Sequence, residues 1–368
     1  MSIHLFHGDT HFDFVGKRRL GYLVSAILML LSLVAVLLNG GLRYGVDFAG
    51  GAAVQLQFAS PVDDEAIKNA FSGMNLPGLA VQRYGEDGRD YLVRFSPPSG
   101  MTGESIREGV LSALQSAFAG NTAVIQRLEM VGPKVGADLR NAALEALYYA
   151  ILLITVYISG RFEHRWMIAA IMAAALGGAM YVTGLSGLGM APRVCAALLL
   201  TLVLCWKLRL NFALGAIVGL LHDVLVTVGL LTLLGKEFDL NIIAALLTLV
   251  GYSLNDTIIV YDRIRENLVR QSTKTPPALG ALINQSVNQT LGRTIMTSFT
   301  TLLATVSLLV LGGGAIHDFA LTMTIGVFVG TFSTIFVSAP ILLAFGDTER
   351  YLMVRTESYE RPGEHGVV

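Results

Sequence analysis

A single carboxylate stands within an apolar stretch of this chain. Asp256 lies in the segment 241–261, which is long enough to cross a bilayer. Burying an ionisable side chain in hydrocarbon costs about 3 kcal/mol on insertion scales, so such a residue usually faces a bundle interior or a water-filled cavity. We therefore consider Asp256 the leading candidate for a proton relay. The alternative is a structural carboxylate bonded to polar neighbours on other helices.

An arginine at the start of the next apolar segment could complete this relay. Gln285, Gln289 and Arg293 recur every four residues, which places them on one helix face. Asp256 lies near the end of its own segment, so Asp256 and Arg293 are expected at similar depth. The alternative is that Arg293 only extends to the membrane surface. Gln289 is a possible accessory residue.

A histidine and an aspartate stand side by side in another apolar segment, 212–234. Histidine side chains in general titrate near neutral pH, so His222 could pass protons. A buried pair bonded to each other or to the backbone is an equally good interpretation. We count His222 and Asp223, together with Asn255 beside Asp256, as possible accessory residues.

Several kinds of chemistry leave no pattern in the sequence. It contains no phosphate-binding G-x-x-x-x-G-K-[ST], no metal-ligand spacing and no nucleophile elbow. We therefore expect no enzyme activity, no metal and no cofactor, with an ion gradient or a partner as the energy source. The formal net charge of -1 argues against a nucleic-acid partner. Cys195 and Cys205 are expected to be inert packing residues.

The composition is that of a polytopic membrane protein. It is 53% hydrophobic and 14% charged, against about 25% charged residues in a soluble domain. About eight apolar segments are expected to cross the membrane: 20–38, 139–159, 166–185, 194–206, 212–234, 240–261, 294–311 and 319–345.

Lysine and arginine alternate between the loops in the way the positive-inside rule requires. The loop with Arg161 and Arg165 and the loop after Arg263 fall on one side, and the opposite short loops carry only Arg193 and Lys236. We therefore expect a cytoplasmic N-terminus (1–19), a first transmembrane helix (20–42), a periplasmic domain (43–135), a transmembrane bundle (136–346) and a cytoplasmic tail (347–368).

The external segment 43–135 has the pattern of a small α+β domain. Residues 53–58 alternate with a period of two, as a half-buried strand does. Further strands are expected at 80–84, 91–95 and 122–130, with helices at 63–71 and from 102 to about 120. The resulting βαββαβ order is that of a ferredoxin-like unit. The alternative is that this domain has no function of its own and is only a stable spacer.

Five motifs, taken together and in order, resemble one known family. They are GVDFAGG at 45–51, VGPKVG at 131–136, LHDV at 221–224, the segment 251–267 and NQTLGRT at 288–294. This set is similar to that of the SecF subunit of the bacterial Sec protein-export machinery, within the SecD/SecF family of the RND superfamily. By position, Asp256 matches that family's intramembrane aspartate and Arg293 its functional arginine.

The resemblance implies a fold, a set of partners and a function. It implies an RND-type bundle, a SecD partner chain, association with the SecYEG channel and exported preproteins as substrates. It also implies residence in the bacterial inner membrane, with proton-driven help in late steps of export. The coupling ion, H⁺ or Na⁺, and the stoichiometry with SecD stay open.

One segment departs from this family pattern. Family members usually have six spans, whereas here an extra hairpin at about 166–206 brings the count to eight. Its placement stays open at this stage. The alternative function is a proton-coupled RND-type small-molecule efflux transporter. That function normally needs a twin half and larger external domains, and this chain carries neither.

Overall fold

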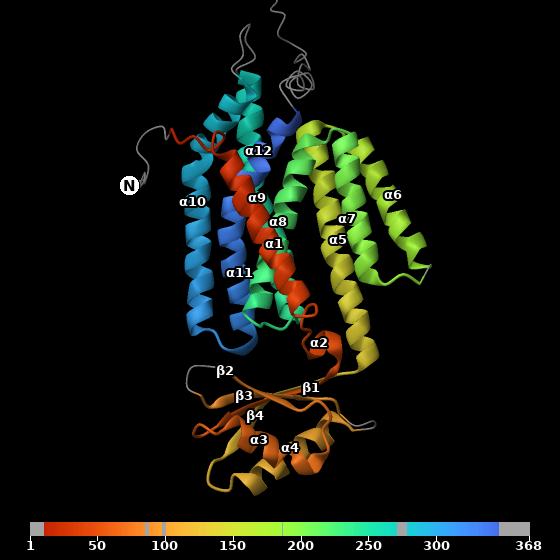
Figure 1. Ribbon diagram of the computed structural model, residues 1–368, viewed down its shortest axis with the longest axis vertical. Coiled ribbons are helices and arrows are strands. Elements are labelled where there is room, and N and C mark those ends of the chain that lie inside the picture. The colour runs from red at the N-terminus through yellow and green to blue at the C-terminus, as the bar shows by residue number, and fades with distance from the viewer. Residues whose placement is uncertain (1–10, 85–87, 98–100, 186, 271–277, 346–368) are drawn as a thin grey trace, which may run out of the picture.

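A computed structural model describes residues 11–84, 88–97, 101–185, 187–270 and 278–345. A helical bundle forms one end of the molecule and a small α+β domain the other (Figure 1). Eight helices in the described part are long and apolar enough to cross a membrane, which confirms the expected count. The tail expected at 347–368 and the first part of the N-terminal segment, 1–10, lie outside the described residues.

The bundle helices follow the expected apolar segments closely. They are α1 (Arg18–Leu38), α5 (Pro133–Glu163), α6 (Trp166–Gly184), α7 (Met190–Lys207), α8 (Asn211–Leu233), α9 (Leu240–Arg270), α10 (Leu279–Leu311) and α11 (Gly314–Ser333). The first helix ends before residue 42 because Gly40 and Gly41 adopt positive φ angles. Helix α10 begins well before residue 294, so the polar stripe with Gln289 is already helical.

The last span is not one regular α-helix. Helix α11 continues as a π-helical segment, η2 (Thr334–Ser338), then as α12 (Ala339–Ile341) and a 3₁₀ segment, η3 (Leu342–Phe345). Pro340 lacks an amide hydrogen, so it disturbs the helical ladder near this change. Only the apolar length of this span could be expected from its sequence.

The external domain has the expected βαββαβ order. Its elements are α2 (Val46–Ala49), β1 (Gly51–Phe58), α3 (Asp64–Ala70), η1 (Ser72–Met74), β2 (Ala80–Tyr84), β3 (Asp90–Phe95), α4 (Gly103–Ala117) and β4 (Ala123–Val131). The sheet order is β2-β3-β1-β4, and all neighbouring strands are antiparallel. This is the ferredoxin-like arrangement.

The core of this domain lies on one face of the sheet. Phe58 and Val93 from the strands meet Ile67 of α3 and Ile106 of α4 there. A capping box between Thr102 and Ser105 starts α4 where the sequence indicates it. In Figure 1 the two helices lie on the side of the sheet away from the bundle, so the other face of the sheet is turned toward the bundle.

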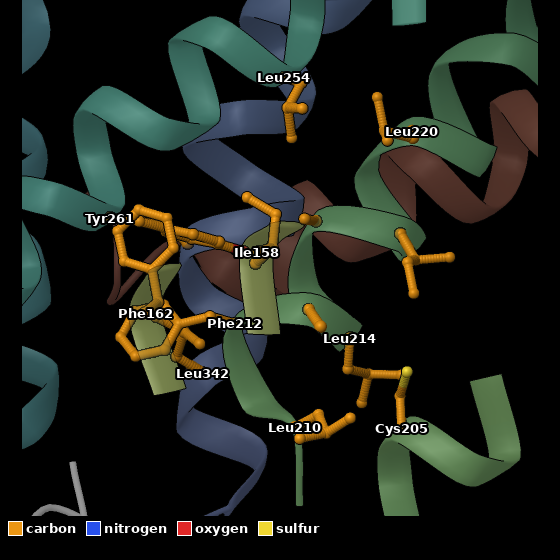
Figure 2. Packing of buried hydrophobic residues seen from close by; sticks show 14 of the residues in the cluster. Ile158, Phe162, Cys205, Leu210, Phe212, Leu214, Leu220, Leu254, Tyr261 and Leu342 are labelled. Atoms are coloured by element: carbon orange, nitrogen blue, oxygen red, sulfur yellow. The ribbon is translucent and has the colours of Figure 1, made fainter. Parts of the chain in front are cut away.

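An aromatic cluster ties three bundle helices together. Figure 2 shows Phe162 of α5, Phe212 of α8 and Tyr261 of α9 gathered at one end of the core. Their ring centroids lie 5.1 to 5.8 Å apart. Cys205 is buried beside this core, as expected for a packing residue, whereas Cys195 is exposed.

Helices α9 and α11 pack in a regular register at the centre of the bundle. Ser253 faces Gly330, and one turn further Thr257 bonds to Thr334, at 3.2 Å between their hydroxyl oxygens. One turn further again, the Tyr261 hydroxyl donates to the Ser338 carbonyl at 3.1 Å. A side chain at Gly326 would overlap Leu249. The G-x-x-x-G motif thus permits the close approach of these helices.

The extra hairpin, α6 and α7, packs on one side of the bundle. Both helices contact α5, and α7 also contacts α8. In Figure 1, α6 lies at the edge of the molecule, away from α10. Arg165, just before α6, donates to the Leu208 carbonyl just after α7, at 2.7 Å, and so closes the open end of the hairpin. The structure thereby answers where this segment lies.

Candidate functional site

Asp256 is buried in the middle of the bundle and is surrounded by hydroxyl groups. Its side chain is 2% exposed. Thr297 Oγ1 lies 3.2 Å from Asp256 Oδ1, and Ser298 Oγ lies 3.4 Å from Oδ2. Ser298 also shares a hydrogen bond with Thr331 of α11, at 2.7 Å. Hydroxyls can donate to a carboxylate and accept from a carboxylic acid, so these contacts suit both protonation states of Asp256.

Arg293 lies one helical turn from the level of Asp256. It precedes Thr297 by four residues on α10, a rise of about 6 Å. The two side chains form no direct ion pair, although both lie in the described part of the chain, and Arg293 is exposed. The arginine therefore stands beside the carboxylate without being bound to it.

His222 and Asp223 form a second buried polar cluster. His222 Nδ1 lies 3.0 Å from Asp223 Oδ1, and both side chains are 1% exposed. The Ser253 hydroxyl of α9 donates to the other carboxylate oxygen, Asp223 Oδ2, at 2.5 Å. Asp223 is therefore bonded through both oxygens, to an imidazole on its own helix and to a hydroxyl on the next.

Helix α11 brings the two clusters close together. A Cβ atom at Gly330 would lie 3.2 Å from Ser253 Oγ and 3.4 Å from Asp223 Oδ2. The next residue, Thr331, bonds to Ser298, which contacts Asp256. Ser253 and Asp256 are three residues apart, almost one turn, on α9. The buried carboxylates thus lie on adjacent faces of the α9–α11 pair.

Gln289 and Asn255, the two remaining candidate accessory residues, also form no hydrogen bond with Asp256 within the described ranges. Gln289 Oε1 accepts from Arg263 Nε at 2.6 Å and from Asn267 Nδ2 at 2.8 Å, and so ties α10 to the extension of α9. Asn255 is exposed on α9 and makes no hydrogen bond within the described ranges. The structure gives Gln289 a connecting role and leaves Asn255 outside the buried clusters.

The polar stripe of α10 also holds the segment that precedes α1. Asn288 and Asn284 bond to the backbone of Phe12 in both directions: Phe12 N donates to Asn288 Oδ1 at 2.9 Å, and Asn284 Nδ2 donates to the Phe12 carbonyl at 3.0 Å. Asn284 Oδ1 also accepts from Phe14 N at 2.8 Å. These asparagines are bound to backbone and not to Asp256.

The helix that carries Asp256 is fixed at its other end to the external domain. Asp47 of α2 accepts from Leu240 N, the first residue of α9, at 3.0 Å. Gly45 N donates to the Phe238 carbonyl at 2.9 Å, and Arg94 of β3 forms an ion pair with Glu237. The GVDFAGG segment is therefore the connection between the sheet and the start of α9.

The hydroxyl residues around the two carboxylates were not singled out from the sequence. Ser253, Thr297, Ser298 and Thr331 lie in apolar spans, where serine and threonine are frequent and usually bond to their own helix. Glu163 was missed as well: its carboxylate accepts from Phe212 N at 2.9 Å at the start of α8. The sequence feature that could have indicated Thr297 and Ser298 is their position one helical turn after Arg293.

These features define a class of protein. A bundle of apolar helices surrounds a buried carboxylate, and a ferredoxin-like domain sits on one end, as in an RND-type membrane protein. The family model "Protein export membrane protein SecD/SecF, C-terminal" matches residues 111–199 and 189–348, and "SecD/SecF GG Motif" matches residues 35–62. The chain therefore belongs to the SecD/SecF family. The two longer matches overlap within α7, in the extra hairpin.

Similar proteins cover nearly the whole chain. The protein translocase subunit SecF of Magnetococcus marinus is 38% identical over 96% of this chain and 98% of its own length. The SecF subunit of Escherichia coli O157:H7 is 32% identical over 97% and 95%. The crystal structure of SecDF, a translocon-associated membrane protein from Thermus thermophilus, superposes with a TM-score of 0.64 at 32% identity. That match covers 92% of this chain and 39% of the SecDF chain.

Proposed function

We propose that this chain is an auxiliary subunit of the Sec protein translocase that uses the proton gradient to promote late steps of protein export. It works with a SecD-like chain beside the SecYEG channel, acts on exported preproteins and catalyses no reaction itself. It resides in a bacterial inner membrane with both termini in the cytoplasm. The names of its relatives support the export role. The observation that carries the proton coupling is the buried Asp256 within a set of hydroxyls that suits both protonation states.

In this mechanism Asp256 gains and loses one proton in each cycle. A guanidinium near the carboxylate stabilises its ionised form, and withdrawal of Arg293 favours the protonated acid. Each charge that crosses the membrane supplies about 2.3 kcal/mol per 100 mV. Because Asp47 caps α9 and Arg94 binds Glu237, a shift of α9 reaches the external domain directly.

The substitution Asp256→Asn tests the proton coupling. It keeps the size of the side chain and its hydrogen bonding, but it cannot ionise. The variant is expected to insert normally and to lose gradient-dependent stimulation of translocation in vesicles that contain a SecD-like chain. Asn255→Ala, on the exposed side of the same helix, is the matched control and keeps that stimulation. Wild-type stimulation in Asp256→Asn would make Asp256 a structural residue.

Co-purification separates the export subunit from the efflux transporter. The chain matches 39% of the SecDF chain, which supports a role as one part of a larger assembly. An export subunit is expected to be recovered with a SecD-like chain after mild solubilisation. A self-sufficient transporter would instead move small molecules in vesicles that contain this chain alone.

A further inference from the structure

Several buried polar atoms near the Asp223 cluster have no partner among the described residues, Thr227 Oγ1 and Tyr252 Oη among them. Two of these atoms lie on neighbouring helices: Ser25 Oγ on α1 and His222 Nε2 on α8. Ser25 is 6% exposed and His222 is 1% exposed, so neither atom reaches the surface. Buried polar atoms are almost always hydrogen-bonded to protein or to ordered water, so each of these two calls for a partner.

The packing of α1 on α8 places these two atoms at the same level. Ser32 of α1 lies against Gly229 of α8, where a Cβ atom would overlap it. Gly21 near the start of α1 lies against Phe336 of η2, and Gly219 in the first half of α8 lies against Ser338 of η2, so the two helices run in the same direction. Ser25 precedes Ser32 by seven residues, and His222 precedes Gly229 by the same seven. Seven residues are two helical turns, so Ser25 faces His222.

Contacts through α11 and η2 lead to the same placement. A Cβ atom at Gly21 would lie 2.8 Å from Phe336. The Phe336 ring stacks on Phe332 at 5.1 Å, and the Phe332 ring lies 6.3 Å from that of His222. One turn beyond Gly21 on α1 is Ser25, and one turn back from Phe336 is Phe332. Both routes therefore bring Ser25 toward the edge of the His222 ring that faces away from Asp223.

We propose that Ser25 Oγ and His222 Nε2 together bind a water molecule, and that this site extends the proton path from Asp223 to α1. The inference rests on the proposed proton coupling. A buried water typically makes two to four hydrogen bonds to protein groups that otherwise lack partners. The hydroxyl and the imidazole nitrogen supply two of these hydrogen bonds. The resulting proton path runs from Ser25 through His222 and Asp223 to Ser253.

The proton moves along this path by exchange of O–H and N–H bonds alone. The water gives a proton to Nε2 of neutral His222, and the Nδ1 proton passes to Asp223 Oδ1. Histidine is then neutral in its other tautomer, Asp223 is protonated, and the water regains its proton from the far side. Ser253 Oγ bonds to the other carboxyl oxygen, Oδ2, so the protonated Asp223 carboxyl group must rotate before it gives the proton to Ser253 Oγ. Ser253 then releases its own hydroxyl proton toward Asp256, three residues further along α9.

Few other ionisable groups face His222. Helix α1 brings only Tyr22, three residues before Ser25, and α9 brings Tyr252 and Asp256 on the turn of Ser253. Helix α11 contributes Phe332 and Gly330, which do not titrate. Helices α5 and α7 place Glu163 and Cys205 near the first turns of α8, roughly 15 Å along the helix from His222.

The test compares Ser25→Ala with Ser32→Ala, in the full chain together with its SecD-like partner. Both serines lie on the same face of α1 and are 6% exposed, but Ser32 lies against Gly229, two turns away from the level of His222. Ser25→Ala is expected to lower proton-driven stimulation of translocation severalfold, and Ser25→Thr to restore it. His222→Gln is expected to lower it on the order of a hundredfold, the usual effect of losing a proton-transfer group. Ser32→Ala leaves it unchanged.

A second measurement does not depend on translocation. In ¹⁵N-histidine-labelled protein in nanodiscs, the His222 signal, assigned by its loss in His222→Gln, is expected to shift at Nε2 in Ser25→Ala and not in Ser32→Ala. Equal effects of both serine variants, or none, would overturn the water site even where Asp256→Asn abolishes stimulation. Retention of stimulation by Asp256→Asn would instead remove the proposed function, while the ¹⁵N shift still decides the water site.

Discussion

At the scale of single residues, the two buried carboxylates differ in what they touch. Asp256 contacts hydroxyls from α10, whereas Asp223 is bonded to an imidazole and to Ser253. A hydroxyl group reorients easily, so Asp256 can exchange a proton without loss of its contacts. Asp223 has a titratable neighbour that can take up the proton it releases. The geometry therefore suits Asp256 to coupling and Asp223 to transfer.

Arg293 provides the prediction that belongs to this scale. Its positively charged guanidinium is exposed and lies one turn from the level of Asp256, without a direct ion pair between the two described side chains. If that charge switches the carboxylate, Arg293→Ala inserts normally and loses gradient-dependent stimulation, while Arg293→Lys keeps part of it. The measurement is translocation in vesicles with and without an imposed gradient. An arginine that only extends to the membrane surface would tolerate alanine with full stimulation.

The sequence could indicate Asp256 but not its surroundings. A charged residue within an apolar segment can be recognised from the sequence alone, and so can the adjacent pair His222 and Asp223. Which serines and threonines turn toward them depends on how α9, α10 and α11 rotate about their axes, including the close approach of α9 to Gly326 and Gly330 of α11. Asn255, expected only as a possible accessory residue, lies on the exposed side of α9 because adjacent residues on a helix point in different directions.

At the scale of elements, α9 is the connection between site and external domain. Its start is held by two carboxylates: Asp47 Oδ2 accepts from Leu240 N, and Asp239 Oδ1 accepts from Ile242 N at 2.9 Å. Carboxylates near a helix N-terminus satisfy amide groups that have no partner within the helix. The motif containing Asp47 was recognisable from sequence, but its contact with Leu240 was not, because the two are far apart in the chain.

Asp239 gives a pH prediction at this scale. Burial raises the pKa of Asp239 above its ordinary value, and the nearby charges of Asp318 and Asp47 act in the same direction. The folded protein then binds this proton more tightly than the unfolded chain. The stability from Asp239 is therefore complete below about pH 4, the ordinary aspartate value, and is lost as the pH rises through the raised pKa.

Asp239→Asn keeps an oxygen for the Ile242 amide and removes the titration. In detergent, the apparent Tm of wild type is expected to fall relative to that of the variant as the pH rises from about 4 to neutral. At low pH the two proteins should unfold at similar temperatures. A difference in Tm that stays constant with pH would contradict a raised pKa at Asp239.

At the scale of the whole molecule, the loop charges predict the orientation in the membrane. Ser72 is exposed on the external domain, and Val269 is exposed on the extension of α9. In a background with Cys195 and Cys205 replaced by alanine, an impermeant reagent outside spheroplasts is expected to label Ser72→Cys and not Val269→Cys. The reverse pattern would invert the expected topology, with the N-terminus and the α9 extension outside.

The extra hairpin tests which part of the molecule the coupling needs. None of the residues around Asp256, Asp223 or His222 lies in α6 or α7, and α6 occupies the edge of the bundle (Figure 1). Removal of residues 166–206 takes away an even number of spans, so α8 and all later helices keep their orientation. The surface of α8 that α7 contacts lies on the outside of the bundle once the hairpin is removed, and lipid can cover it equally well.

The shortened chain is therefore expected to insert with unchanged topology and to keep gradient-dependent stimulation. Its control is a chain without residues 53–127, which should insert but lose stimulation, because that deletion removes the Arg94–Glu237 contact along with most of the sheet and leaves α9 with no domain to move. Labelling at Val269→Cys and translocation in vesicles measure the two properties separately.

Normal insertion without stimulation in the chain lacking the hairpin would mean that α6 and α7 supply a contact on which coupling depends. That contact would lie outside the proposed proton path of α1, α8 and α9, because the deleted helices pack against α5 and α8.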